Sequence, residues 1–401
     1  MYAEKVFTRV SSILQEYLEY FHLGVRRGPY RVMRELTTGI VWTGSVQLTS
    51  AARLFSHTTN QLEAAVERMS QCLADRHWDH RELAMAVLVD QVREIDEDTL
   101  VPIDTTDLAK PYARCMEYQG IVRDASRPGD PLVRGYWCWG AYRFDPTAEV
   151  LAPLILRPYS TQEPDFHGEN EVWDQAYHAL RAATGGRGIW IQDRGGDRPS
   201  VLSTWLRIQP RWIIRLRGDR GLIGPDGSLR PAQAWADWAL RQRTEHGHAV
   251  TLKVALPRDR IAQGPDPPPL WLVVPSYTSA DGQSWLLLTC GLIDRHAGPR
   301  QIRHDYAFRW RAEDAKRFLG QVWHVEHFLV RSFVALQRTL LCVILAGHFL
   351  ATLQRDYPHL SEQLQSQGLY WDKPYRIPAY RLARGLRFAA CQAEQEAAMF
   401  N

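Results

Sequence analysis

The chain has 401 residues, of which 45% are hydrophobic and 23% are charged, and its formal net charge is +3. This length and composition predict two or three folded modules with a sizeable core, and they exclude an intrinsically disordered chain. The six cysteines are scattered without zinc-site spacing, which predicts reduced thiols in a cytoplasmic protein. The longest apolar run, residues 340–350, is too short to span a bilayer. It predicts a buried helix and no membrane partner.

Residues 1–95 have apolar positions at helical spacing, in short segments separated by polar turns. Residues 46–55 and 62–73 show this pattern most clearly. One interpretation is a small helical DNA-binding module. A short helical domain of another kind would have the same pattern, so periodicity alone leaves both open.

From about residue 98 the pattern changes to strands followed by alternating helix and strand, which indicates an α/β core. Strands are predicted at 100–103, 135–144, 150–156, 188–192 and 211–217, and helices at 169–184 and 199–208. Residues 219–300 interrupt this core as a β-rich insertion, with an amphipathic segment at 231–243 and strands at 249–256, 270–277 and 284–294. Two helices, 305–322 and 325–353, come next.

Two aspartates occupy the ends of predicted strands. Asp104 follows Val101-Pro102-Ile103, and Asp193 follows Trp190-Ile191-Gln192 and precedes two glycines that permit a sharp turn. Open α/β sheets place ligand-binding groups at the carboxyl ends of their strands. Both carboxylates are therefore candidate site residues.

Glu313 belongs to a predicted helix with two distinct faces. An apolar stripe is predicted to be buried, and it consists of Phe308, Ala312, Ala315, Leu319 and Val322. The opposite stripe contains Tyr306, Arg309, Glu313 and Arg317, each one turn from the next. A solvated face with ion pairs is the plain interpretation. Together with the two aspartates, the same stripe would place a carboxylate between two arginines.

Three carboxylates from two strands and one helix suit a hard divalent cation such as Mg²⁺, which prefers oxygen ligands. A pair of such ions about 4 Å apart supports displacement at a phosphodiester without a histidine base. The sequence therefore predicts a two-metal site formed by Asp104, Asp193 and Glu313.

Residues 306–313, Y-A-F-R-W-R-A-E, resemble the Y-x-x-R-W-x-x-E signature of bacterial insertion-sequence transposases of the IS-four type. Asp104-Thr105-Thr106 is similar to the D-T-T of that family, and Asp193-Arg194 is similar to its D-R. Trp285-Leu286-Leu287-Leu288-Thr289 looks like its W-L-L-L-T segment, inside an insertion at the corresponding place. The resemblance covers roughly residues 35–350.

This resemblance implies a DDE transposase with a ribonuclease-H-like core, Mg²⁺ or Mn²⁺ dependence, and Asp104, Asp193 and Glu313 as catalytic and metal-binding residues. It implies double-stranded DNA, as transposon ends and target, as the partner of a homodimer in a bacterial cytoplasm. The corresponding division is a helical N-terminal DNA-binding region (1–95), the first part of the core (96–218), the insertion (219–300), core helices with Glu313 (301–353) and a C-terminal tail (354–401).

The predicted DNA-binding residues surround the acids. They are Tyr306, Arg309, Lys316, Arg317, Arg215, Arg217, Arg220 and Trp285. By resemblance, Trp285 stacks on a base flipped out of the duplex, although a strand tryptophan is often simply packed. One departure concerns the lysine that the family has seven residues after the glutamate, where this chain has Gly320. Lys316 or Arg317 is the candidate replacement.

Two other classes of protein fit parts of the pattern. A non-catalytic DNA-binding relative would keep DNA affinity without metal-dependent cutting. A glycosidase would use two carboxylates, without phosphate-binding arginines around them. Glu326 is an alternative third carboxylate, but it lacks the flanking Arg/Tyr stripe.

Overall fold

The computed structural model describes residues 2–22, 25–124, 127–242, 249–275, 285–293, 298–368 and 378–399. The protein is of the mixed α/β class, and its chain divides into two compact units. Unit 1 comprises residues 1–92, 105–166 and 314–401, and unit 2 comprises residues 93–104 and 167–313. Each unit therefore consists of segments that are separated in the sequence.

Unit 1 contains most of the helices. Those before the first strand are α1 (Tyr2–Tyr20), α2 (Arg27–Thr43), α3 (Leu48–Arg53), α4 (Thr59–Ala74) and α5 (Arg81–Gln91). The 3-10 turn Val92–Glu94 follows, and only its first residue belongs to unit 1. Those at the other end of the chain are α11 (Phe333–Asp356), α12 (Pro358–Gln367) and α13 (Pro378–Met399). The helices predicted within residues 1–95 are thus confirmed.

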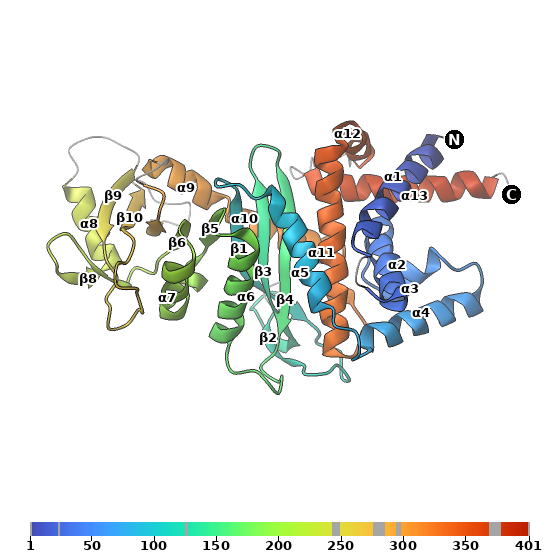
Figure 1. The fold of residues 1–401 in the computed structure, drawn as a ribbon, viewed down its shortest axis with the longest axis horizontal. Coiled ribbons are helices and arrows are strands. Elements are labelled where there is room, and N and C mark those ends of the chain that lie inside the picture. Colours follow the sequence, from blue (N-terminus) through green and yellow to red (C-terminus); the bar gives the residue numbers. More distant parts are fainter. Residues whose placement is uncertain are drawn as a thin grey trace. The chain divides into compact units, whose positions relative to one another are not determined.

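The strands of unit 1 are β2 (Gly120–Arg123), β3 (Leu132–Asp145) and β4 (Val150–Tyr159), with the second half of β1 (Leu100–Ala109). β3 pairs with β2 on one side and with β4, both antiparallel. β4 carries Val150 and Ala152 against Ala351 of α11, and Figure 1 shows α11 alongside these strands. The sheet and α11 therefore form the centre of this unit.

Helix α11 is buried along most of its length, including the predicted run 340–350. It is the one helix in the described part of the chain that is long and apolar enough to cross a membrane, and 89% of its most apolar window is buried inside the protein. Arg338, on this helix, donates hydrogen bonds to the carbonyls of Leu73 and Trp78. These bonds join α4 and the segment after it to α11, and the Leu73 carbonyl is one that the end of α4 leaves unpaired.

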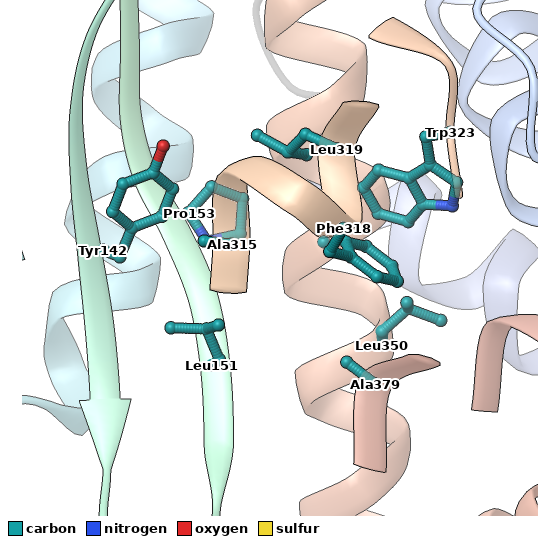
Figure 2. A pocket seen from close by; sticks show the side chains of 10 residues that line it. Tyr142, Leu151, Pro153, Ala315, Phe318, Leu319, Trp323, Leu350 and Ala379 are labelled. Carbon is teal, nitrogen blue, oxygen red and sulfur yellow. The ribbon is translucent and has the colours of Figure 1, made fainter. Parts of the chain in front are cut away.

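A small apolar pocket lies between β3, β4, α10 (Trp310–Gln321), α11 and α13 within unit 1. Figure 2 shows Phe318, Leu319 and Trp323 on one side of it and Leu151 on the strand side. Gly347 allows α11 to approach β4 closely, because a Cβ there would lie 2.6 Å from Pro153 Cδ. The lining supplies packing surface rather than reactive groups.

His348 of α11 is buried, and its Nδ1 atom lies 3.0 Å from the Tyr17 hydroxyl oxygen. Its Nε2 atom has no hydrogen-bond partner among the described residues. Burial, assisted by the charge of Arg143 and opposed by that of Asp356, lowers the pKa of His348 to about 3. As the pH falls, His348 is therefore protonated in the unfolded chain at a higher pH than in the folded protein, where the imidazole stays neutral.

Acid should accordingly destabilise unit 1 through His348. Because its folded pKa is depressed, its contribution is complete above the unfolded value of 6.5 and is lost below it. We expect up to about 1.4 kcal/mol of unfolding free energy to be lost per pH unit between about pH 6 and pH 4. Urea unfolding of the wild type and of His348→Gln at several pH values measures this. If the unfolding free energy changes with pH in the same way in both proteins, His348 does not contribute to the acid sensitivity.

Unit 2 contains a sheet with the strand order β1, β5 (Ile189–Gln192), β6 (Trp212–Arg215), β11 (Leu287–Cys290), β10 (Leu270–Pro275) and β9 (Ala249–Val254). β1, β5 and β6 are parallel, and the remaining strands pair antiparallel. The other elements are α6 (Glu169–Thr184), the 3-10 turn Arg194–Gly196, α7 (Pro199–Ile208), the hairpin β7 (Gly221–Ile223) and β8 (Leu229–Pro231), α8 (Ala232–Arg241) and α9 (Pro299–Ala307).

The core of unit 2 is rich in aromatic rings. Tyr177 of α6 contacts Trp190 of β5, with ring centroids 5.8 Å apart. Trp205 of α7 packs edge-on against Trp190 and against Trp212 of β6, at 5.5 and 5.9 Å. Contacts of this kind add to the area buried by each ring. They hold α6 and α7 on β5, which leads directly into Asp193, and on β6.

The insertion forms strands close to those predicted. β9 and β10 begin at the predicted residues 249 and 270, and β11 covers the middle of the predicted strand 284–294. Residues 276–277, 284 and 294 of the predicted strands lie outside the described residues. The hairpin β7–β8 was not predicted, because its strands have three residues each and show no clear alternation.

Both long helices predicted near Glu313 are wrong in extent. The segment 305–322 is divided between α9, which ends at Ala307, and α10, which begins at Trp310. Between them, Arg309 N donates to Tyr306 O at 2.9 Å, a tighter turn than the α-helix has. The second predicted helix begins only at Phe333, where Ser332 caps α11 by accepting from Ala335 N; before it lies the 3-10 turn Val325–His327.

Candidate active site

Asp104 and Asp193 occupy adjacent positions on two neighbouring parallel strands. β1 and β5 are in register with Ile103 opposite Gln192, so the two aspartates are the next residues on these strands. Neighbouring strands lie about 4.8 Å apart. The strand-end placement predicted from the sequence is present for Asp193, which directly follows β5, whereas Asp104 lies within β1, which continues to Ala109.

Arg215 continues this row on the third parallel strand. Gln192 of β5 is opposite Ile214 of β6, so that Asp193 and Arg215 also follow a paired position. The row Asp104, Asp193, Arg215 thus crosses three parallel strands within unit 2. The arginine next to Asp193 partly compensates the negative charge of the two carboxylates.

The side chain of Asp193 is held by its own loop. Its Oδ1 atom accepts a hydrogen bond from Gly195 N at 2.7 Å and caps the following 3-10 turn. A Cβ at position 195 would lie 2.9 Å from that oxygen, so only glycine permits the approach without a shift. The Asp-Arg-Gly sequence therefore orients the carboxylate before any ligand binds.

Arg309 links Asp104 to Glu313. Its Nη1 atom lies 3.5 Å from Asp104 Oδ2 and 3.7 Å from Glu313 Oε1. Its side chain is 12% exposed, that of Asp104 is 14% exposed and that of Glu313 is 32% exposed. The guanidinium supplies the positive charge between two carboxylates that would otherwise repel each other.

Among the described residues, no group of three or more His, Cys, Asp and Glu side chains is arranged to hold a metal ion. Asp104 is thus near Asp193 by strand register and near Glu313 through Arg309. The structure brings the predicted acids into one region of unit 2 without closing them around one point.

Tyr306 differs from its predicted place on an exposed stripe. It is 3% exposed, because α9 ends directly after it and its side chain enters the fold. Burial raises the pKa of Tyr306 well above its usual value, while Arg309 and Arg215 lower it and Asp193 raises it. Arg215 is also hydrogen-bonded to it through the side chains. Tyr306 therefore lies among the charged residues of the site.

Trp285 lies beside Tyr306, at the start of the segment that leads into β11. Its ring meets that of Tyr306 edge-on, with centroids 5.2 Å apart. It is half-buried, so one part of the indole is packed and another faces solvent. The structure thus places Trp285 at the edge of the acidic site. Ser284, which preceded it in the predicted strand, lies outside the described residues.

Arg217 and Arg220 converge on a residue that sequence reasoning missed, the buried Asp197. Arg220 Nε donates to Asp197 Oδ1 at 2.6 Å, and Arg217 Nε lies 3.5 Å from Oδ2. The Arg220 side chain is only 11% exposed, whereas that of Arg217 is 55% exposed. Arg220 is therefore engaged in the fold, and Arg217 keeps an exposed face. In the sequence, this buried residue could have been noticed as the aspartate that ends the segment Asp193-Arg-Gly-Gly-Asp197.

The remaining predicted residues belong to unit 1. Lys316 Nζ donates to Thr105 O at 3.0 Å, and Arg317 is exposed. Glu326, the alternative third carboxylate, accepts a hydrogen bond from Ala109 N at 3.4 Å. Burial raises its pKa, and Asp107 and Asp124 raise it further. Its neighbours are thus different from those of Glu313.

Comparison with known proteins found a likeness among solved structures. No protein-family model matches the sequence, and no curated protein matches it. Among solved structures, the chain is similar to a piggyBac transposase in a synaptic complex with hairpin DNA, with a TM-score of 0.48 and 12% sequence identity. The alignment covers 99% of this chain and 81% of that chain. The function of this chain is therefore argued from its own site.

Proposed function

We propose that this chain is a DDE transposase with a ribonuclease-H-like core, which cuts DNA at the inverted repeats of an insertion sequence and joins the ends to target DNA. One observation carries the proposal: Asp104 within β1 and Asp193 directly after β5 occupy neighbouring positions on two parallel strands, and Arg309 connects Asp104 to Glu313. Asp104 thus neighbours both of the other acids that the sequence motifs single out, and arginines and an aromatic ring lie nearby.

The donor set fits a hard divalent cation. Asp104, Asp193 and Glu313 offer carboxylate oxygens, which Mg²⁺ and Mn²⁺ prefer over nitrogen or sulfur ligands. The place between Asp104 and Glu313 already holds a positive group, the Arg309 guanidinium. Bound by these three residues, two such ions supply activation of the attacking oxygen and stabilisation of the leaving oxygen.

The residues of the chain orient the groups that react. Gly195 N holds the Asp193 carboxylate in one direction. Arg309 exchanges its carboxylate partners for a phosphate oxygen when DNA binds, because a guanidinium binds phosphate in the same forked geometry. This exchange frees Asp104 and Glu313 to hold cations. DNA binding and assembly of the metal site are thereby coupled.

The arginines and lysine around the acids guide the DNA backbone. Arg215 lies beside Asp193 in the strand row, and Arg217 has an exposed side chain. Lys316 and Arg317 follow Glu313 on α10. Contacts of this kind position DNA without reading its sequence. The enzyme acts as a homodimer in a complex that holds two transposon ends.

Metal-dependent cutting tests the proposal. The substrate is a labelled duplex made from the DNA that flanks the reading frame, where imperfect inverted repeats are expected. Cleavage at the repeat boundary should require Mg²⁺ or Mn²⁺ and should stop when EDTA removes the metal, whereas DNA binding should persist. Binding without cutting under any metal condition would identify a non-catalytic relative. Cutting that EDTA leaves unchanged would exclude the two-metal mechanism.

A further inference from the structure

Strand β2 and the start of β3 form a two-stranded ribbon in unit 1. The strands pair antiparallel, with Ile121 opposite Arg134 and Arg123 opposite Leu132. β2 stands at the end of the strand order, so the ribbon has an outer edge. Neither the metal site nor its arginines include any of these residues.

The two faces of the ribbon differ. The inner face carries Val122, which is 1% exposed, and Gly135, where a Cβ would lie 2.5 Å from Leu108 O. The outer face carries Ile121 and Leu132, which are 56% and 74% exposed, together with the exposed Arg123 and Arg134. Each exposed apolar side chain is thus directly opposite an arginine.

The charge of this face is positive. Asp124, the acid that follows β2, is buried and paired with Arg127, whose Nε lies 3.0 Å from Asp124 Oδ2. Asp130 is exposed, but it lies in the loop beyond the ladder rather than on the outer face. The described residues of the outer face therefore combine two cations with two apolar groups, and none of them is a carboxylate.

We propose that this ribbon enters the major groove of duplex DNA and contacts base edges there. The major groove admits a two-stranded ribbon, arginine pairs with guanine O6 and N7, and apolar side chains contact the thymine methyl group. The outer face carries both kinds of group, and its charge is complementary to DNA. The inference rests on the proposed function in that both require DNA as partner, but it concerns binding and not cutting.

The first test measures DNA affinity without metal. A duplex selected by the full-length protein from a random-sequence library serves as the probe, and fluorescence anisotropy reports binding. The double variant Arg123→Glu/Arg134→Glu should bind at least tenfold more weakly. The matched control is Arg241→Glu/Lys253→Glu, which changes the net charge equally at two exposed positions outside the predicted DNA-binding residues. It should lose less than the ribbon variant, and equal loss in both would overturn the proposal.

The second test concerns the thymine methyl group. Ile121→Ser/Leu132→Ser keeps every charge and alters two exposed side chains, so the fold should be retained, as circular dichroism can verify. The wild type should bind the selected duplex more tightly than the same duplex with uracil in place of thymine. The serine variant should show no such difference. A difference that persists in the variant would contradict base-edge contact by these residues.

The outcomes separate this inference from the proposed function. DNA binding that depends on the ribbon in a protein that never cuts DNA would support the ribbon and reject the transposase. Metal-dependent cutting, together with ribbon variants that bind DNA normally, would support the transposase and reject the role of the ribbon. If the serine variant binds DNA normally but changes from dimer to monomer in solution, the ribbon contacts a second copy of the chain, and the inference is wrong.

Discussion

Replacing Asp104, Asp193 or Glu313 by alanine is expected to abolish strand cleavage while leaving binding to transposon-end DNA largely intact. Each residue is proposed to hold metal rather than DNA. Loss of a residue that merely supports a metal ligand typically costs 10–100-fold, so loss of a ligand itself should reduce the cleavage rate by more than about a hundredfold. A labelled end duplex measures cutting, and a gel shift in EDTA measures binding.

The controls for this experiment come from the same unit. Asp219→Ala removes an exposed aspartate outside the site and should cut normally. Asp104→Asn preserves the shape of the side chain and its contact with Arg309, so its failure to cut would separate lost charge from lost packing. Cleavage that survives in the Glu313 variant and disappears in Glu326→Ala would move the third carboxylate to Glu326.

Trp285→Ala is expected to preserve first-strand nicking and to prevent closure of the second strand. We interpret the solvent-facing part of the Trp285 ring as a platform for a flipped base, next to the acids through Tyr306. Stacking is worth about 1–3 kcal/mol per base, enough to offset much of the cost of unstacking. Trp285→Phe keeps an aromatic plane and should retain part of the closure activity. The two steps are compared on a labelled transposon-end duplex.

A structural role for Trp285 would give a different result. Its edge-on contact with Tyr306 also contributes packing, so some loss of stability, about 1–3 kcal/mol, is expected in the alanine variant. Trp271→Ala is the matched control, because Trp271 is a half-buried tryptophan on the neighbouring strand β10. If Trp285→Ala lowers the melting temperature sharply and slows both steps equally, the base-flipping role is excluded.

The sequence alone determined the elements whose signals are local. The helix predicted at 169–184 has the bounds of α6, because its apolar period ends at Gly185, which adopts the left-handed conformation of a helix cap. The strand that ends before Asp193 was also predictable, since a buried parallel strand appears as a short apolar run before a polar turn. The strand before Asp104 was predicted as well, but its end was wrong, because β1 continues to Ala109. A resemblance in short motifs then singled out the same acids.

Only the tertiary structure decided which of these groups meet. The helical stripe placed Tyr306 beside Arg309 on an exposed face, but the chain turns after Ala307, and Tyr306 is buried instead. Asp197 pairs with Arg217 and Arg220, which lie about twenty residues further along the chain, and hydrophobic periodicity gives no sign of this pairing. Periodicity reports neighbours three or four residues apart, whereas contacts of Arg309 with Asp104 depend on strand order and helix packing. The sequence therefore named the candidate acids, and the fold determined their partners.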